Sequence, residues 1–328
     1  MHPNKRLVGY HASHEQFPPD ELLGLVQRAE HAGFTAAMCS DHFHPWSDAQ
    51  GQSGHAWTWL GAAMATTHFP YAVVNAPIGR YHPAVIAQAV ATLCVMHDGR
   101  FTLIAGSGEA LNEAITGRRW PAKAERNRRL RAAVEAMRVL WRGEEIKQSP
   151  PDVGFRIEQA RLYTRPTTIP KVFVAALSEE TAQAVAGWAD GLVTVSMPDD
   201  GHHEVLKAFR NAGGKDKPAW VQVKLSYDET EIAALRGAHR QWRTNVLEGE
   251  VSEELRTPKQ FEDAASFVTP DDVARAVRVS ADLDAHVEWL RGDFSAGFDA
   301  LMLHNVNRAQ ARFIEDFGRV VLPALEKR

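Results

Sequence analysis

The stretch Thr35-Ala-Ala-Met-Cys-Ser-Asp-His-Phe-His-Pro-Trp46 decides the fold, because a short apolar run ends abruptly in ionisable side chains. We expect a strand at 35–40, after a helix at 19–32 that ends at Gly33, a residue that commonly stops helices. With a first strand at 6–10 this makes one strand-and-helix unit, and the polar residues stand where the second strand ends.

The same alternation of strand and helix continues along the chain. Further strands are expected at 71–76, 101–105, 171–176, 191–196, 219–227 and 300–304, and further helices at 57–67, 84–96, 124–141, 179–189, 203–211, 230–247, 285–294 and 311–326. A proline-rich excursion at 144–170, after strand 4, and an acidic, irregular insertion at 248–270, after strand 7, interrupt the pattern. Eight strands alternating with helices predict an α/β fold, a (β/α)8 TIM barrel, as one domain over residues 1–328.

Composition excludes several classes of protein. The net charge of -4 provides no basic field for a polyphosphate backbone, so nucleic acid is not an expected partner. Cys39 and Cys94 are too few for a disulfide framework, which favours a reducing compartment. The chain starts without a hydrophobic signal region and has no apolar run of membrane-spanning length. We therefore expect a cytoplasmic protein without a membrane partner.

Ionisable side chains stand at four of the expected strand ends, where TIM barrels carry their chemistry. They are His11, His14 and Glu15 after the first strand, Asp41, His42 and His44 after the second, Glu109 after the fourth and His304 at the eighth. Their convergence on one mouth is the main prediction, although a single histidine in such a place is more often a hydrogen-bonded loop residue. Trp46 either shields a reaction centre from water or simply packs.

Two backbone segments at this mouth have the form of ligand cradles. Gly106-Ser107-Gly108, before Glu109, allows close approach of backbone N–H groups to a planar ring, but is also typical of a tight strand-to-helix turn. Ser178 has the position of a helix N-cap that could receive a phosphate. Glu179 and Glu180 directly after it argue against strong anion binding.

These residues belong to longer motifs that resemble the F420-dependent glucose-6-phosphate dehydrogenase group of the luciferase-like superfamily. The motifs are Gly9-Tyr-x-Ala-Ser-x-Glu15-Gln-Phe, Ser40-Asp-His-Phe-x-Pro-Trp46, Arg80-Tyr-x-Pro-Ala-Val-Ile-Ala-Gln-Ala89, Gly106-x-Gly-Glu-Ala-Leu-Asn-Glu113, Trp188-Ala-Asp-Gly191 and His304. The resemblance spans almost the whole chain. It implies a flavin- or deazaflavin-dependent oxidoreductase, a dimer, that acts on a small molecule by hydride transfer or by monooxygenation with reduced flavin.

The resemblance also implies roles for matching residues. His42 and Glu109 are the expected acid and base, in an order left open, with Trp46 beside the reacting centre and Glu15 in support. The implied cofactor-binding residues are Asp41, Val73, Val74, Asn75, Gly106, Ser107, Gly108 and Ser178. No metal ion is expected.

The chain departs from the family pattern at the substrate phosphate. Cationic and hydroxyl residues that hold this phosphate in the sugar-phosphate enzymes are replaced here at about Val195, Pro198, Asp263 and Ala276. Asp263 would repel a phosphate. We therefore expect a substrate without a phosphate, bound near Val195, Asp263 and His304.

The chain also departs at the cofactor phosphate, where Leu177-Ser178 replaces the Gly-Gly turn of the family. A branch of the superfamily thought to have returned from F420 to FMN shares Cys39-Ser-Asp-His-Phe-His-Pro-Trp46 and Leu303-His-Asn-Val306 with this chain. This likeness favours FMN over F420 as the cofactor.

Two other classes of function stay open. His42-Phe-His44 is a His-x-His pair after a strand, so a metal-dependent TIM-barrel hydrolase is the alternative, although that pair belongs on the first strand in such hydrolases. A non-catalytic flavin-binding protein on the same barrel is the third possibility. Retention of Glu15, His42, Trp46 and Glu109 argues against it.

Overall fold

A closed ring of eight parallel strands forms the centre of the computed structural model, which describes residues 6–247 and 250–326. The strands are β1 (Leu7–Ala12), β2 (Ala36–Ser40), β3 (Tyr71–Asn75), β4 (Phe101–Ala105), β7 (Val172–Ala175), β8 (Gly191–Val195), β9 (Ala219–Ser226) and β11 (Ala300–Asn305). Parallel pairing runs from β1 through β8, and β8 with β9, β9 with β11 and β11 with β1 close the ring. The predicted (β/α)8 barrel is confirmed.

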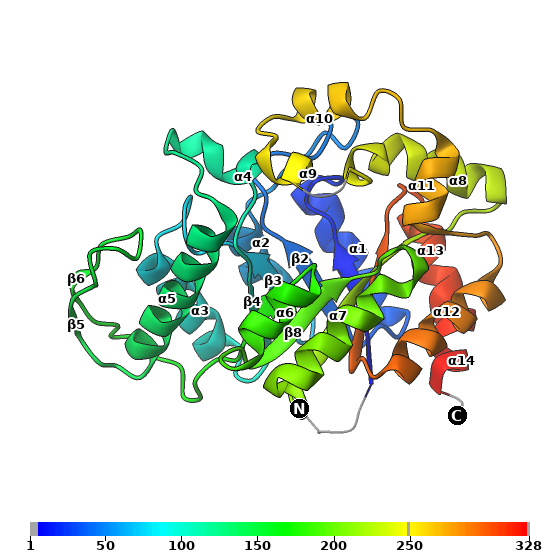
Figure 1. Cartoon of the computed structure of the whole chain (residues 1–328). Helices are drawn as coiled ribbons and strands as arrows, with labels where there is room; N and C mark the ends of the chain where they lie inside the picture. The colour runs from blue at the N-terminus through cyan, green and yellow to red at the C-terminus, as the bar shows by residue number, and fades with distance from the viewer. Residues whose placement is uncertain (1–5, 248–249, 327–328) are drawn as a thin grey trace.

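Helices surround this ring in the order that the sequence pattern predicts (Figure 1). They are α1 (Pro19–His31), α2 (Ala56–Thr66), α3 (Pro83–Met96), α5 (Lys123–Trp141), α6 (Glu179–Ala186), α7 (Gly201–Phe209), α8 (Glu231–Trp242), α12 (Leu283–Ala296), α13 (Gln310–Asp316) and α14 (Leu322–Glu326). Hydroxyl side chains set two of their starts, because Ser178 and Thr230 accept a hydrogen bond from the third residue of α6 and of α8. None of the helices in the described ranges is long and apolar enough to cross a membrane.

Alternation along each strand divides the core into two parts. Met38 and Trp220 belong to a cluster inside the barrel, whereas Cys39 and Val221 pack between the sheet and the helices. β1 extends to Ala12, two residues beyond the predicted end, so His11 lies within the strand.

Both predicted insertions are present, but each has more regular structure than expected. The excursion after β4 contains an antiparallel pair of strands, β5 (Ile146–Gln148) and β6 (Glu158–Ala160). The helix expected at 230–247 ends at Trp242 and continues as a short 3-10 turn.

The late insertion is helical rather than irregular. It consists of α9 (Glu250–Glu254), α10 (Pro258–Ala264) and α11 (Pro270–Ala276), and a short strand β10 (Arg278–Val279) then pairs with β9; Glu248 and Gly249 lie outside the described residues. Thr257 and Thr269 are the N-caps of α10 and α11, and a proline follows each. These local signals outweigh the acidic composition that suggested irregular chain.

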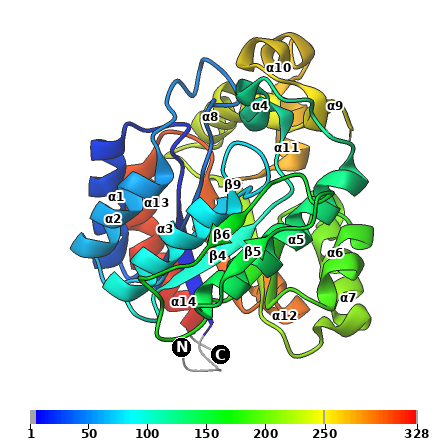
Figure 2. The same ribbon diagram turned by 90° about the vertical axis from the view of Figure 1, so that its left-hand side faces the viewer.

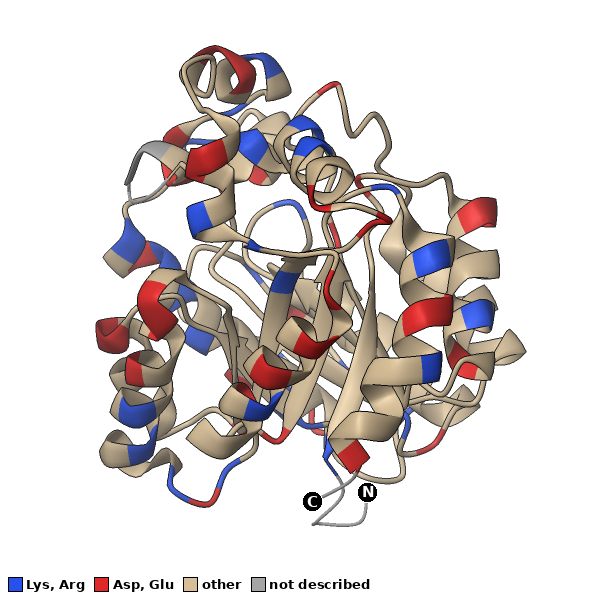
Figure 3. Cartoon of the chain, turned by 90° about the vertical axis from the view of Figure 1, so that its right-hand side faces the viewer, with Lys and Arg blue, Asp and Glu red and all other residues tan. Residues whose placement is uncertain are grey.

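The insertion and the loop after β4 meet over one end of the barrel. Figures 1 and 2 both show α4 (Ala110–Glu113), α9 and α10 at the same end of the molecule, and α9 contacts α4. This end receives the carboxyl ends of the strands. Lys and Arg are interspersed with Asp and Glu on the face that Figure 3 shows.

Candidate active site

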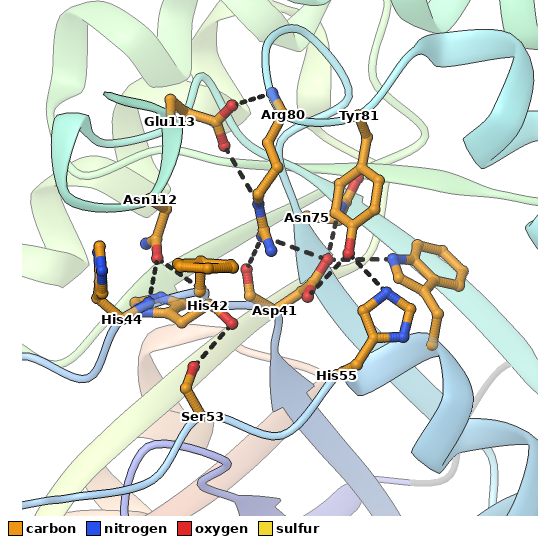
Figure 4. Close-up of polar contacts among 12 residues, drawn as sticks. Asp41, His42, His44, Ser53, His55, Asn75, Arg80, Tyr81, Asn112 and Glu113 are labelled. Atoms are coloured by element: carbon orange, nitrogen blue, oxygen red, sulfur yellow. Dashed lines mark hydrogen bonds and ion pairs between the residues drawn. The ribbon is translucent and has the colours of Figure 1, made fainter. Parts of the chain in front are cut away.

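Asp41 is the polar centre of the barrel mouth (Figure 4). It follows β2 directly and is almost fully buried. Its Oδ2 accepts hydrogen bonds from Trp57 Nε1 at 3.1 Å and Asn75 Nδ2 at 2.8 Å, and Arg80 Nη2 lies 3.5 Å away. A buried carboxyl group with this many donors is fixed in position.

Arg80 and Glu113 support Asp41, and sequence reasoning gave neither of them a role. Arg80 Nη2 donates to the Asp41 carbonyl oxygen at 2.6 Å, and the Arg80 amide donates to Glu113 Oε2. A Cβ at Gly79 would clash with the same Glu113 oxygen, which explains the glycine there. Burial raises the pKa of Glu113, although the contacts with Arg80 oppose this rise. The sequence motifs that contain Arg80 and Glu113 were the signal that could have identified these two residues as part of the site.

Asn112 fixes the loop that carries His42 and His44. Its Oδ1 accepts from the backbone N–H of Phe43 at 2.8 Å and of His44 at 3.3 Å. His44 Nδ1 lies 3.0 Å from the carbonyl oxygen of Leu111. His44 is therefore a loop residue that contacts α4 through the Leu111 carbonyl oxygen, which is the commoner situation for a histidine after a strand.

Glu15 and His42 form a carboxylate–imidazole pair. The distance from Glu15 Oε1 to His42 Nδ1 is 3.5 Å, and both side chains are largely buried. Burial alone would raise the pKa of Glu15, but His42, backbone N–H groups and Ser13 outweigh it and lower the pKa. An ionised Glu15 favours a proton on His42 Nδ1 and leaves the other ring nitrogen as an acceptor.

The environment of Glu109 affects its carboxyl group in the opposite direction to that of Glu15. Its Oε2 is buried and has no hydrogen-bond partner among the described residues. Burial raises the pKa of Glu109, and Glu15 adds to the rise, whereas His42 opposes it. The carboxyl group is thereby biased towards its protonated form.

Three further histidines lie buried around Glu15 and His42, and burial lowers the pKa of each. The pKa of His14 and of His304 falls to about 4, and that of His11 falls well below its ordinary value. His304 Nε2 lies 3.1 Å from Gln16 Oε1, and the field of Lys224 lowers the His304 pKa further. These imidazoles are neutral near pH 7.

Aromatic rings pack against His42 and His304. The Trp46 ring lies 5.4 Å from the His42 ring and meets Phe261 of α10 edge to face at 5.1 Å. Trp242 lies against His304 at 4.8 Å. Trp46 therefore packs between His42 and α10, and its role as a shield of the reaction centre stays a prediction.

A cavity of about 380 Å³ opens beside Asp41, within the size range of ligand pockets. Its walls include Asp41, His42, Val74, Asn75, Gly106, Ser107, Gly108, Glu109, Leu177 and Ser178. A Cβ at Gly106 would meet protein atoms only at 4.0 Å, so this glycine leaves open space for a ligand. The open face of Gly106 and the unpartnered oxygen of Glu109 fit a flat ring with polar edges.

Three of the predicted binding residues are placed differently from expectation. Val73 points out of the barrel into the core under the helices, because only its neighbour Val74 has inward parity. Val195 shares the inward parity of Val193 but is not part of the cavity wall. Ser178 lines the cavity, but its Oγ already caps α6.

Asp263, which was predicted to lie at the substrate site, lies outside the cavity wall. It lies on the solvent side of α10, largely exposed, with both carboxylate oxygens 2.9 Å from Lys259 Nζ. Phe261 of the same helix is buried against Trp46, so the phase of α10 turns Asp263 to the solvent side. Asp263 is therefore not part of the cavity wall, and its predicted place at the substrate site stays a prediction.

The alternative of a metal-dependent hydrolase finds no support in this geometry. In the described part of the chain, the group of potential metal ligands that comes together is Asp200, His202, His203 and Asp293, outside the mouth. His42 and His44 instead contact Glu15 and Leu111.

Barrel, cavity and ionisable mouth together define a TIM-barrel enzyme. The family model of the luciferase-like monooxygenases matches residues 1–300, and the chain belongs to this family. It is an oxidoreductase of the flavin and deazaflavin class, as the resemblance predicted.

Similar proteins cover almost the whole chain. F420-dependent glucose-6-phosphate dehydrogenases of Segniliparus rotundus and Beutenbergia cavernae are 36% and 34% identical, covering 97% of both chains and 98% of both chains respectively. A solved F420-dependent secondary alcohol dehydrogenase, in complex with an F420-acetone adduct, is 28% identical with a TM-score of 0.89, covering 98% of this chain and 99% of its own. The preference for FMN finds no support in these relatives.

Proposed function

We propose that this protein is an F420-dependent dehydrogenase that oxidises a small alcohol without a phosphate. The opposite environments of Glu15–His42 and Glu109 carry the proposal, because they place an acceptor and a donor of protons on one cavity. Similarity to F420-dependent relatives, including an alcohol dehydrogenase, supports the cofactor and the substrate class.

The acid and the base have separate tasks. When bound, F420 supplies the hydride acceptor for the substrate C–H bond. His42, with Glu15 behind its Nδ1, accepts the hydroxyl proton as the carbonyl forms. Glu109 holds a proton for the ring, because burial favours its neutral form. This assigns His42 as the base and Glu109 as the acid.

The cofactor would rest on the residues of the cavity wall. Val74, Asn75, Gly106 and Gly108 are placed to contact its ring, and Asp41 holds Asn75 in place. Trp46 and Phe261 keep water from the reacting atoms. The single domain over 1–328, the homodimer, the cytoplasmic location and the lack of a nucleic-acid partner stay predictions.

Turnover with defined alcohols tests this proposal. Purified protein is mixed with F420 and either propan-2-ol, other secondary alcohols or glucose 6-phosphate, and the absorbance band of oxidised F420 is followed. We expect the band to decline with the secondary alcohols only, and no alcohol oxidation when FMN replaces F420. Decline with glucose 6-phosphate alone would contradict the substrate class, and oxidation with FMN alone would contradict the cofactor.

A further inference from the structure

The cavity beside Asp41 has a second end, formed by the starts of helices rather than by the ends of strands. Lys123 and Asn127 from the beginning of α5 line it, together with Ser178 and Thr181 of α6 and Glu253 of α9. The same cavity therefore connects the ionisable mouth with a cationic helix start.

The start of α5 concentrates positive charge. Its N-cap, Ala122, offers no side-chain hydrogen bond to the first N–H groups, and the first turn holds Lys123 together with Glu125, a carboxylate that is already paired with two other arginines. The N-terminus of a helix is already partly positive, so a cation there is unfavourable unless an anion lies nearby. Arg126, one turn further on, is 2% exposed.

The guanidinium of Arg126 is fixed inside the protein by two contacts. Its Nη1 donates to the Pro121 carbonyl oxygen at 2.9 Å, and its guanidinium lies 4.5 Å from the centre of the Trp120 ring. Its Nε is buried without a hydrogen-bond partner in the described ranges. A buried guanidinium held in this way requires an anion close by.

Glu253 supplies that anion. Arg126 Nη2 donates to Glu253 Oε2, and Lys123 Nζ lies 3.6 Å from Glu253 Oε1. The Glu253 side chain is 32% exposed and comes from the short helix α9, which lies far from α5 in sequence. A partly exposed carboxylate therefore occupies the place that an anionic ligand group would take.

The neighbouring start of α6 is less suited to an anion. Ser178 Oγ already accepts from the Thr181 amide at 3.3 Å, and Glu179 and Glu180 occupy the first turn. Two carboxylates at a helix start already satisfy its positive end and repel a phosphate. Of the two helix starts that line the cavity, α5 is the one with cations.

We propose that Lys123 binds the phosphate of the cofactor, and that Glu253, anchored by Arg126 behind the cavity wall, holds this site as an internal anion until the phosphate displaces it. The inference rests on the proposed function, since it places the phosphate of a bound deazaflavin or flavin. It explains how the chain manages without a glycine-rich phosphate turn at Leu177-Ser178. Lys123 is a specificity residue for the phosphate and takes no part in the chemistry, and Arg126 positions Glu253.

Matched cofactors with and without a phosphate test this inference. The Kd values of the deazariboflavin core of F420 and of the 5′-phosphate of this core, which differ by the phosphate alone, are measured together with that of F420 by fluorescence titration for the wild type, Lys123→Gln and Glu253→Gln. We expect Lys123→Gln to raise the Kd of F420 and of the 5′-phosphate about tenfold and to leave that of the core unchanged. Glu253→Gln should lower the Kd of F420 severalfold, because the competing anion is gone.

Lys207→Gln is the matched control. Lys207 is an exposed lysine of α7 paired with Glu204, so its loss should leave these Kd values unchanged. Thermal unfolding of each variant confirms that it folds, and Lys123 is half exposed, so its replacement disturbs little packing.

The outcomes separate the two proposals. Equal changes for F420 and its core in Lys123→Gln, or weaker F420 binding in Glu253→Gln, would overturn the inference while the proposed function stands. If the wild type binds neither F420 nor the core, the proposed function fails and the phosphate site fails with it.

Discussion

The two ends of the cavity are built in different ways. At the ring end, Asp41, Glu109 and His42 follow directly from strands of the barrel and are held by buried hydrogen bonds or burial itself. At the far end, Lys123 comes from the start of α5 and Glu253 from the short helix α9, and the two form a partly exposed ion pair. The comparison indicates that the barrel strands fix the positions of the residues proposed to react. The helices and the insertion instead determine which ligand groups bind at the far end of the cavity. Strand ends are rigid, and helix insertions vary more easily.

Loss of the base at the ring end should have the largest effect. His42→Ala is expected to lower turnover roughly 100- to 10,000-fold, because the hydroxyl proton loses its acceptor, while the Kd of F420 stays unchanged. Steady-state kinetics and a fluorescence titration measure the two quantities. His44→Ala is the matched control, since His44 contacts the Leu111 carbonyl oxygen, and should retain most turnover. Equal losses in both variants would remove the assigned role.

Loss of the acid should come next and should change the pH profile. Glu109→Gln is expected to lower turnover about 100-fold. Because burial raises the Glu109 pKa and the protonated form is active, wild-type turnover should fall as the pH rises through that pKa. The variant should lack this fall. A profile identical in shape for wild type and variant would show that Glu109 is not the acid.

Protonation of the buried His304 should lower the free energy of unfolding in acid. The pKa of His304 is about 4 in the folded protein, against an ordinary value of 6.5 for histidine, so the unfolded chain binds more protons between these two values. The free energy of unfolding should therefore decrease as the pH falls, by about 2 kcal/mol from pH 7 to pH 5 for this residue. Urea unfolding at both pH values measures it. His304→Gln should reduce the pH dependence by this amount, since His14 and His286 have similarly lowered pKa values and keep their share, and an unchanged slope would contradict the assignment.

The smallest effect is expected in the late insertion. Asp263→Asn removes only an exposed pair with Lys259, so the midpoint of thermal unfolding should not change measurably. The KM for the alcohol should not change either. A clear change in KM would return Asp263 to the substrate site and would blur the contrast between rigid mouth and variable insertion.

Sequence reasoning succeeded where position along a strand decides position in space. Asp41 and Glu109 were predictable because parallel strands end at one face of a barrel. Arg80 and Glu113 were missed as parts of the site because their contact depends on the path of the loop after β3. Asp263 lies outside the cavity wall because one-residue shifts in the phase of a helix decide whether a side chain faces the mouth or solvent. The alternation of side chains along β3 also places Val73 outside the barrel and Val74 inside it.

Lys123 shows a further limit of sequence reasoning. Its partner Glu253 lies more than a hundred residues away, on an insertion whose acidic composition suggested no regular structure. Pairing between such distant segments depends on the closed fold, and no local pattern announces it.

The most direct test of the central claim is a parallel titration of the wild type with F420 and with FMN, followed by tryptophan fluorescence. Trp46 and Trp57 lie beside the cavity residues His42 and Asp41, so occupancy of the ring end should quench their emission. We predict saturable binding of F420 with a Kd at least about tenfold below that of FMN. Equal or tighter binding of FMN would contradict the assignment of this chain as an F420-dependent dehydrogenase.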